Sequence, residues 1–379
     1  MKEVSSSGTG DNLSGIQILR AIAAFMVVFH HADWVVKRNF AIEYWPTFGA
    51  TGVDLFFVIS GFIICLTTSR TADPGQFMRK RLVRIVPLYW LVTFITFAIM
   101  CADERFLGWQ EVSAVNLVKS LSFIPYGGGG GVIQPILYVG WSLSYEMLFY
   151  ILWAMTLLLF PVSIGRRVLL TGGILTALVV IGILVEPTKA VARFFVHPIM
   201  LEFVAGAGIG WAYVYGRSFF ARAPLSICAA AFALALITLA QFSGRGTLRA
   251  AAAGLAVTVV VVVVLVLEAR GSPLRSPLLE TLGNASYAIY LTHPLIIAVA
   301  RRAPILDWME PGFVRLLATS FALPTAIACI GVASYYSFER PINRWLRDPR
   351  RPSRHPTWSM SRPTRCAKSP PRPRRTTRA

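Results

Sequence analysis

Charged residues are scarce in this sequence, and the cysteine patterns typical of metal or redox sites are missing from it. Only 15% of the 379 residues are charged, whereas 55% are hydrophobic. The mean hydropathy of +0.59 is too high for a soluble protein of this length. The five cysteines are scattered without metal or redox spacing, so we expect no metal site and assign them no chemistry.

A phosphate-binding loop is also missing. The five-glycine run at 127–131 lacks the Gly-Lys-Ser/Thr ending with which a P-loop holds nucleotide phosphates. Gly-rich segments are flexible, and we interpret this one as a connector. We expect no permanently bound cofactor.

In place of charge, the sequence has long apolar runs. A helix needs about 20 residues to cross a bilayer. The predicted spans are 16–36, 49–69, 83–101, 137–160, 168–185, 198–216, 224–241, 248–268, 284–301 and 313–338. We therefore predict an all-α, polytopic membrane protein with about ten transmembrane helices. Its transmembrane domain is predicted at 16–341, between a short N-terminal segment at 1–15 and a C-terminal tail at 342–379.

Basic residues outnumber acidic ones, 37 to 18, and their positions predict the orientation. Cytoplasmic loops of membrane proteins carry an excess of Lys and Arg. The predicted loop Arg70–Arg84 and the Pro-rich tail at 342–379 are both strongly basic. We therefore expect a multi-pass protein of the inner (plasma) membrane with both termini in the cytoplasm. The tail lacks the apolar residues of a core, so we expect it to be disordered and to contact anionic lipid headgroups rather than nucleic acid.

The first predicted span carries two ionisable groups on one face. Eleven residues at about 100° each place His31 within roughly 20° of Arg20 and some 16 Å further along the helix. Ionisable groups at membrane depth are costly and indicate function. His30 is rotated by about 100° from His31, so we expect it to point elsewhere. His31 is the candidate proton acceptor.

Two carboxylates in other spans are candidate partners of that imidazole. Asp54 lies near the start of the second span, and Glu146 lies within the apolar fourth span. A nearby carboxylate could orient His31 and stabilise its protonated form. Structural roles remain open for both: Asp54 favours a helix N-terminus through the macrodipole, and Glu146 could serve only as a hydrogen-bonding group.

Basic side chains mark two further candidate sites. Arg81 and Arg84 are three residues apart, so on a helix they share a face that could hold a multiply charged phosphate. Positive-inside topology alone would also place arginines there. His293 precedes Pro294 within the ninth span, where it could either satisfy a proline kink or contact a ligand.

Six motifs in order resemble the integral-membrane acyltransferase 3 family over roughly residues 15–341. They are Arg20 with His31 eleven residues later, Gly-Val-Asp-Leu-Phe-Phe-Val-Ile-Ser-Gly-Phe at 52–62, Arg-x-x-Arg-Ile-x-Pro at 81–87, Trp-Ser-Leu-x-x-Glu at 141–146, Tyr-x-x-Tyr-Leu-x-His-Pro at 287–294 and Glu-Arg-Pro at 339–341. Each motif is weak alone, but their order is specific. The opening Gly-Ile-Gln-Ile-Leu-Arg-Ala is most similar to the branch that acetylates exopolysaccharides.

The resemblance implies ten spans, acyl-CoA as the cytoplasmic donor and O-acylation of a carbohydrate at or beyond the outer face. It implies by position that His31 is the catalytic histidine, with Arg20 as its partner in the first span. The complete candidate set is His31, Asp54 and Glu146 for catalysis, Arg20, Arg81 and Arg84 for binding the acyl-CoA donor, and Trp141, Ser142 and His293 for binding the other substrate.

We predict an O-acetyltransferase that moves an acetyl or short acyl group from acyl-CoA to a hydroxyl of an extracytoplasmic or lipid-linked polysaccharide. Neutral His31 would take the proton from the hydroxyl as its oxygen attacks the thioester. A covalent acyl-histidine relay uses the same residues. Two alternatives remain: the same chemistry on a small acceptor such as a macrolide sugar or lipid A, or a proton-coupled transporter or flippase of sugar or lipid intermediates. Such carriers often repeat a pattern between halves, which this sequence does not show.

Overall fold

The computed structural model describes residues 13–32, 47–69, 73–107, 112–127, 133–241, 247–302 and 318–347. Within these ranges every regular element is a helix, apart from one isolated bridge between Gly127 and Ile133. Most of the predicted N-terminal segment, most of the five-glycine run and the tail from residue 348 onward lie outside the described residues.

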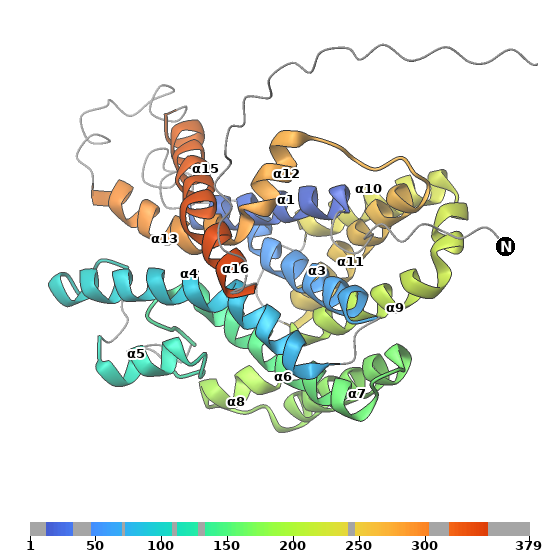
Figure 1. Cartoon of the computed structure of the whole chain (residues 1–379), viewed down its shortest axis with the longest axis horizontal. Coiled ribbons are helices and arrows are strands. Elements are labelled where there is room, and N and C mark those ends of the chain that lie inside the picture. The colour runs from blue at the N-terminus through green and yellow to red at the C-terminus, as the bar shows by residue number, and fades with distance from the viewer. Residues whose placement is uncertain are drawn as a thin grey trace, which may run out of the picture.

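The helices follow one another closely along the chain (Figure 1). They are α1 (Ser14–His31), η1 (Thr47–Ala50), α3 (Thr51–Thr67), α4 (Pro74–Ala102), α5 (Ala114–Leu121), η2 (Tyr138–Gly140), α6 (Trp141–Leu159), α7 (Ile164–Val185), α8 (Ala190–Phe195), α9 (Met200–Arg222), α10 (Leu225–Gln241), α11 (Thr247–Ala269), α12 (Pro277–Asn284), α13 (Ser286–Arg302), η4 (Ala318–Ala322), α15 (Leu323–Ser334), η5 (Tyr335–Glu339) and α16 (Arg340–Arg347).

The helices confirm an all-α, multi-pass membrane protein. Among the described residues, eight helical segments are long and apolar enough to cross a membrane, and the pair α12 and α13 makes a ninth if counted as one span. The 17-residue apolar helix α10 corresponds to the remaining predicted segment at 224–241. Each of the ten predicted spans therefore has a helical counterpart. The cytoplasmic location of both termini stays a prediction.

From Pro74 onward the basic stretch between the second and third spans is helical, which corrects this part of the predicted loop Arg70–Arg84. α4 begins at Pro74, because the side chain of Asp73 accepts hydrogen bonds from the backbone N–H groups of Gly75 and Gln76 at 2.8 and 3.1 Å. The helix has 29 residues, or about 43 Å at 1.5 Å per residue, which exceeds the roughly 30 Å of a hydrocarbon core. The arginines therefore lie on the first turns of a rigid helix.

Two proline positions also differ from expectation. The bend of 70° in the ninth span falls between α12 and α13, around residue 285, whereas Pro294 lies inside α13. The last span does not stop at Pro341. The π-helical turn η5 precedes this proline, and the chain continues as α16 to Arg347. A proline has no N–H to donate, and a local irregular turn lets the affected carbonyl groups find other hydrogen-bond donors.

α3 lies at the centre of the bundle, between α1, α9 and α11 (Figure 1). Two glycines allow α3 and α9 to touch through their backbones. A Cβ atom at Gly61 would lie 2.1 Å from the carbonyl oxygen of Phe203, and one at Gly206 would lie 2.0 Å from that of Val58. Small residues permit such close approach between membrane helices. A different face of α3, which includes Ser60, lines a cavity between the helices.

Candidate active site

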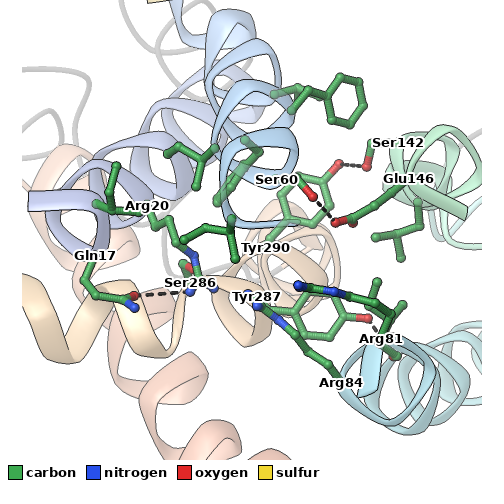
Figure 2. A pocket seen from close by; sticks show the side chains of 18 of the residues that line it. Gln17, Arg20, Ser60, Arg81, Arg84, Ser142, Glu146, Ser286, Tyr287 and Tyr290 are labelled. Atoms are coloured by element: carbon green, nitrogen blue, oxygen red, sulfur yellow. Dashed lines mark hydrogen bonds between the residues drawn. The ribbon is translucent and has the colours of Figure 1, made fainter. Parts of the chain in front are cut away.

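A cavity of about 330 Å³ opens between α1, α3, α4, α6 and α13, with Arg347 of α16 also lining it. Figure 2 shows polar side chains from all five helices pointing into this space. The cavity brings together residues that lie more than 250 positions apart in the sequence, such as Arg20 and Ser286. Only the folded bundle can therefore assemble this site.

One side of the cavity is lined by positively charged side chains. Arg20 donates hydrogen bonds to Ser286 Oγ at 3.0 Å and to Gln17 Oε1 at 3.2 Å. Arg81 donates to Thr67 Oγ1 at 2.9 Å. Figure 2 shows the guanidinium groups of Arg20, Arg81 and Arg84 pointing into the same part of the cavity. Arg81 and Arg84 thus share one helix face, as their spacing predicts.

Carboxylates face these arginines. Glu146 on α6 accepts a hydrogen bond from Ser60 Oγ on α3 at 2.8 Å, and another from the hydroxyl of Tyr150. It attracts Arg20 and Arg81 electrostatically. The structure therefore groups Glu146 with the predicted donor-binding arginines, whereas the sequence analysis grouped it with His31.

A second carboxylate, Glu339 at the end of η5, is buried and faces Arg84 and Arg20. The sequence analysis gave Glu339 no place in the candidate set, although it belongs to the last of the six motifs. Its place in a motif far along the chain was the available signal. With both glutamates ionised, the four arginines that line the cavity still leave an excess of two positive charges.

The histidines form a separate cluster next to the cavity. His31 is the last residue of α1, and its Nδ1 lies 2.9 Å from the carbonyl oxygen of Val27 and 3.2 Å from Nε2 of His293 on α13. The ring of His31 also lies 5.2 Å from that of Tyr138. His293 is fully buried. The structure thus joins two residues that the sequence analysis assigned to different roles.

Tyr290 links the cavity to the histidines. It lines the cavity, its hydroxyl lies 2.7 Å from Ser142 Oγ, and it donates to the carbonyl oxygen of Val139 at 3.0 Å. Its ring lies 5.9 Å from that of His293. The order from the arginines to His31 is therefore cavity, Tyr290, His293 and His31.

Comparison with known proteins assigns this arrangement to a family. A family model described as an acyltransferase domain matches residues 13–340, nearly the whole described chain. The chain belongs to this acyltransferase family. It is therefore an enzyme and a multi-pass membrane acyltransferase, and the resemblance inferred from the six motifs is confirmed.

Some curated relatives match the acyltransferase over most of its length, and another matches a shorter part. The exopolysaccharide production protein ExoZ of Rhizobium meliloti (strain 1021) is 36% identical over 79% of this chain and 90% of its own. The acyltransferase MdmB of Streptomyces mycarofaciens is 25% identical over 85% of this chain and 87% of its own. The O-acetyltransferase OatA of Staphylococcus aureus (strain NCTC 8325 / PS 47) is 26% identical, but over only 38% of this chain and 24% of its own. No solved structure matches.

The structure also describes the remaining candidate residues of the acyltransferase. Ser142 is buried in the cavity wall, and Trp141 is half-buried, 5.9 Å from the ring of Tyr145. Asp54 is buried in the first turn of α3. The Cβ and backbone of His30 pack against Gly49 of η1, but its ring lies 5.2 Å from that of His31, so the two imidazoles are neighbours although His30 was expected to point elsewhere. The catalytic and binding roles of these residues stay predictions.

Two tyrosines of the acyltransferase were missed by the sequence analysis. Tyr287 and Tyr290 both line the cavity, and Tyr287 donates a hydrogen bond to the carbonyl oxygen of Ile85 at 2.7 Å. Together with His293 they repeat every three residues, which places them on adjacent turns of one helix face. That spacing was the available signal. Among the described residues, no group of three or more His, Cys, Asp or Glu could hold a metal ion.

Proposed function

We propose that this acyltransferase transfers an acetyl or short acyl group from cytoplasmic acyl-CoA to a hydroxyl of an extracytoplasmic or lipid-linked polysaccharide, in the inner (plasma) membrane. The observation that carries the proposal is the arginine-lined cavity directly beside a pair of histidines. A polyanionic donor and a proton-accepting group are the two requirements of acyl transfer from a coenzyme A thioester.

The cavity is suited to an anionic donor. Coenzyme A carries several phosphate charges, and an Arg guanidinium binds phosphate through strong, charge-assisted hydrogen bonds. The excess of positive charge around the cavity favours such a ligand over a neutral sugar. Arg347 is exposed at the cavity wall and belongs to the last described helix, so a donor could enter from that end. The predicted orientation makes this the cytoplasmic end.

The chemistry follows from neutral His31. Its imidazole accepts the proton of the acceptor hydroxyl while the hydroxyl oxygen attacks the thioester carbonyl. The tetrahedral intermediate collapses, the C–S bond breaks, and the imidazolium returns the proton to the departing thiolate of coenzyme A. In a covalent relay, His31 itself would first take the acyl group and then pass it to the hydroxyl. Asp54 remains a candidate carboxylate for stabilising the imidazolium, whereas Glu146 would balance the charge of the cavity arginines.

The acceptor class is proposed from relatives. ExoZ is named for exopolysaccharide production, and this chain matches it along almost its full length. OatA is named as an O-acetyltransferase. O-acetylation of an exopolysaccharide hydroxyl fits both names.

The test uses sealed proteoliposomes that contain the purified enzyme. Acetyl-CoA labelled in the acetyl group is supplied on one side, and deacetylated exopolysaccharide from the source strain on the other. We expect label in base-labile ester on the polysaccharide, only when both substrates and the enzyme are present. Movement of unmodified polysaccharide or lipid-linked sugar across the bilayer without ester formation would contradict the proposal and favour a carrier.

A further inference from the structure

A contact with a backbone carbonyl determines which nitrogen of His31 carries the proton. His31 Nδ1 lies 2.9 Å from the carbonyl oxygen of Val27. A carbonyl oxygen accepts hydrogen bonds but never donates them. Nδ1 must therefore carry a hydrogen, and in the neutral ring Nε2 holds the lone pair.

The same reasoning fixes the state of His293. Its Nε2 lies 3.2 Å from His31 Nδ1, which already carries a hydrogen. Two N–H groups cannot point at each other, so Nε2 of His293 is the acceptor and its hydrogen resides on Nδ1. Nδ1 of His293 is buried and has no hydrogen-bond partner among the described residues, so nothing competes with this assignment.

Pro294 makes a backbone carbonyl of α13 available. In a regular helix the carbonyl of Tyr290 would accept from the N–H of residue 294, but a proline has none. The carbonyl oxygen of Tyr290 therefore lacks its helical donor directly beside the turn that carries His293.

We propose that His293 is a positioning residue for His31: it accepts from His31 Nδ1 and holds the imidazole with its Nε2 lone pair ready for the acceptor hydroxyl. This inference rests on the proposed function, in which His31 is the base or the acyl carrier. Either mechanism requires an unprotonated Nε2. When His31 takes up the proton, its Nδ1–H still donates to Val27 and His293, so the imidazolium stays in place. The arrangement follows the logic of a catalytic triad, with a neutral imidazole in the place of the carboxylate.

The kinetic test compares two substitutions of His293. His293→Leu fills the site but removes the acceptor, whereas the amide oxygen of His293→Gln can reach the position of Nε2. We expect kcat to fall at least about 100-fold in the Leu variant, within the usual range for general-base catalysis, with little change in either KM. The Gln variant should recover at least about tenfold of this loss. Thr292→Val, on the same helix, should retain nearly full activity.

A double variant separates this inference from the proposed function. His31→Gln should be inactive, and adding His293→Leu should lower kcat no further, because the two residues act as a unit. If His31→Gln is inactive but His293→Leu keeps full kcat, or raises only the KM for the acceptor, His293 is not a positioning residue although the proposed function survives. If His31→Gln is active, both fail.

A spectroscopic test needs no variant with altered stability. The chain has five histidines, so solid-state ¹⁵N NMR of the histidine-labelled enzyme in lipid can resolve their tautomers, with His30→Gln and His31→Gln used for assignment. We expect a protonated Nδ1 and an unprotonated Nε2 for His31, and the same for His293. A His31 resonance with the proton on Nε2 would overturn the inference.

Discussion

Glu146 on α6 accepts a hydrogen bond from Ser60 on α3, with 2.8 Å between the two oxygens. This bond crosses the cavity wall and holds the carboxylate near Arg20 and Arg81. Glu146 thus has two effects: it accepts a hydrogen bond from Ser60, and its negative charge offsets the positive charge of Arg20 and Arg81. Substitutions can separate these two effects.

Glu146→Gln removes the negative charge but keeps the size of the side chain and its ability to accept from Ser60. We expect kcat/KM for acyl-CoA to fall at least about tenfold, because unbalanced arginines repel each other and rearrange. Ser60→Ala should cost less than Glu146→Gln, because the carboxylate keeps its charge and still accepts from the hydroxyl of Tyr150. Steady-state kinetics of both variants give the two values of kcat/KM for acyl-CoA to be compared. Equal losses would show that the hydrogen bond, and not the charge, is what matters.

His31→Ala should abolish acyl transfer and leave membrane insertion and abundance unchanged, because it removes the proton acceptor and little packing. His30→Ala is the matched control and should keep most activity, because His31 is the imidazole that contacts His293, even though the His30 ring lies 5.2 Å from that of His31. Ester formation per amount of membrane-inserted protein is the measurement. If the two variants exchange behaviour, His30 is the acting imidazole and the argument from the helix face is wrong.

Replacing Arg81 and Arg84 together by Gln should raise the KM for acyl-CoA at least about tenfold and change the KM for the acceptor little, because charge-assisted contacts with phosphate serve the donor. Arg79→Gln is the control, since Arg79 lies outside the cavity and donates to the carbonyl oxygen of Leu346. Initial rates at varied concentrations of each substrate give the two KM values. A larger effect on the acceptor would reassign the cavity to the sugar.

Truncation after Arg347 should leave a folded, active enzyme that responds less to anionic lipid, because a basic, Pro-rich tail serves to contact headgroups. Truncation after Glu339 should inactivate it, because α16 packs against α4 and Arg347 lines the cavity. Activity in vesicles with and without anionic lipid tests both. Complete loss of activity after the shorter deletion, at normal insertion, would place part of the donor site in the tail.

Gly61→Ala should lower stability by several kcal/mol or prevent folding, because the added methyl group would lie 2.1 Å from the backbone of Phe203. Gly208→Ala on α9 is the control, since a Cβ there meets nothing within 4 Å. It should stabilise the helix by about 0.5–1 kcal/mol. Thermal unfolding in detergent compares them. A Gly61→Ala protein with unchanged stability would disprove the close contact of α3 and α9.

Properties that repeat along the chain were available from the sequence. Apolar runs predicted the spans, because each must satisfy its backbone hydrogen bonds within itself and therefore forms a helix wherever it packs. The shared face of Arg81 and Arg84 also followed from local geometry, since three residues make nearly one helical turn. The motif order indicated the family, which the family model confirms.

Only the tertiary structure decided which ionisable side chains from different helices contact one another. Glu146 was expected beside His31 and lies instead with Arg20 and Arg81, while His293 meets His31. Helix rotation and the bend between α12 and α13 set which faces meet. These depend on the packing of glycines such as Gly61 against distant backbone, which no local pattern encodes. Sequence therefore determined which ionisable groups enter the membrane, and packing between helices determined which of them act together.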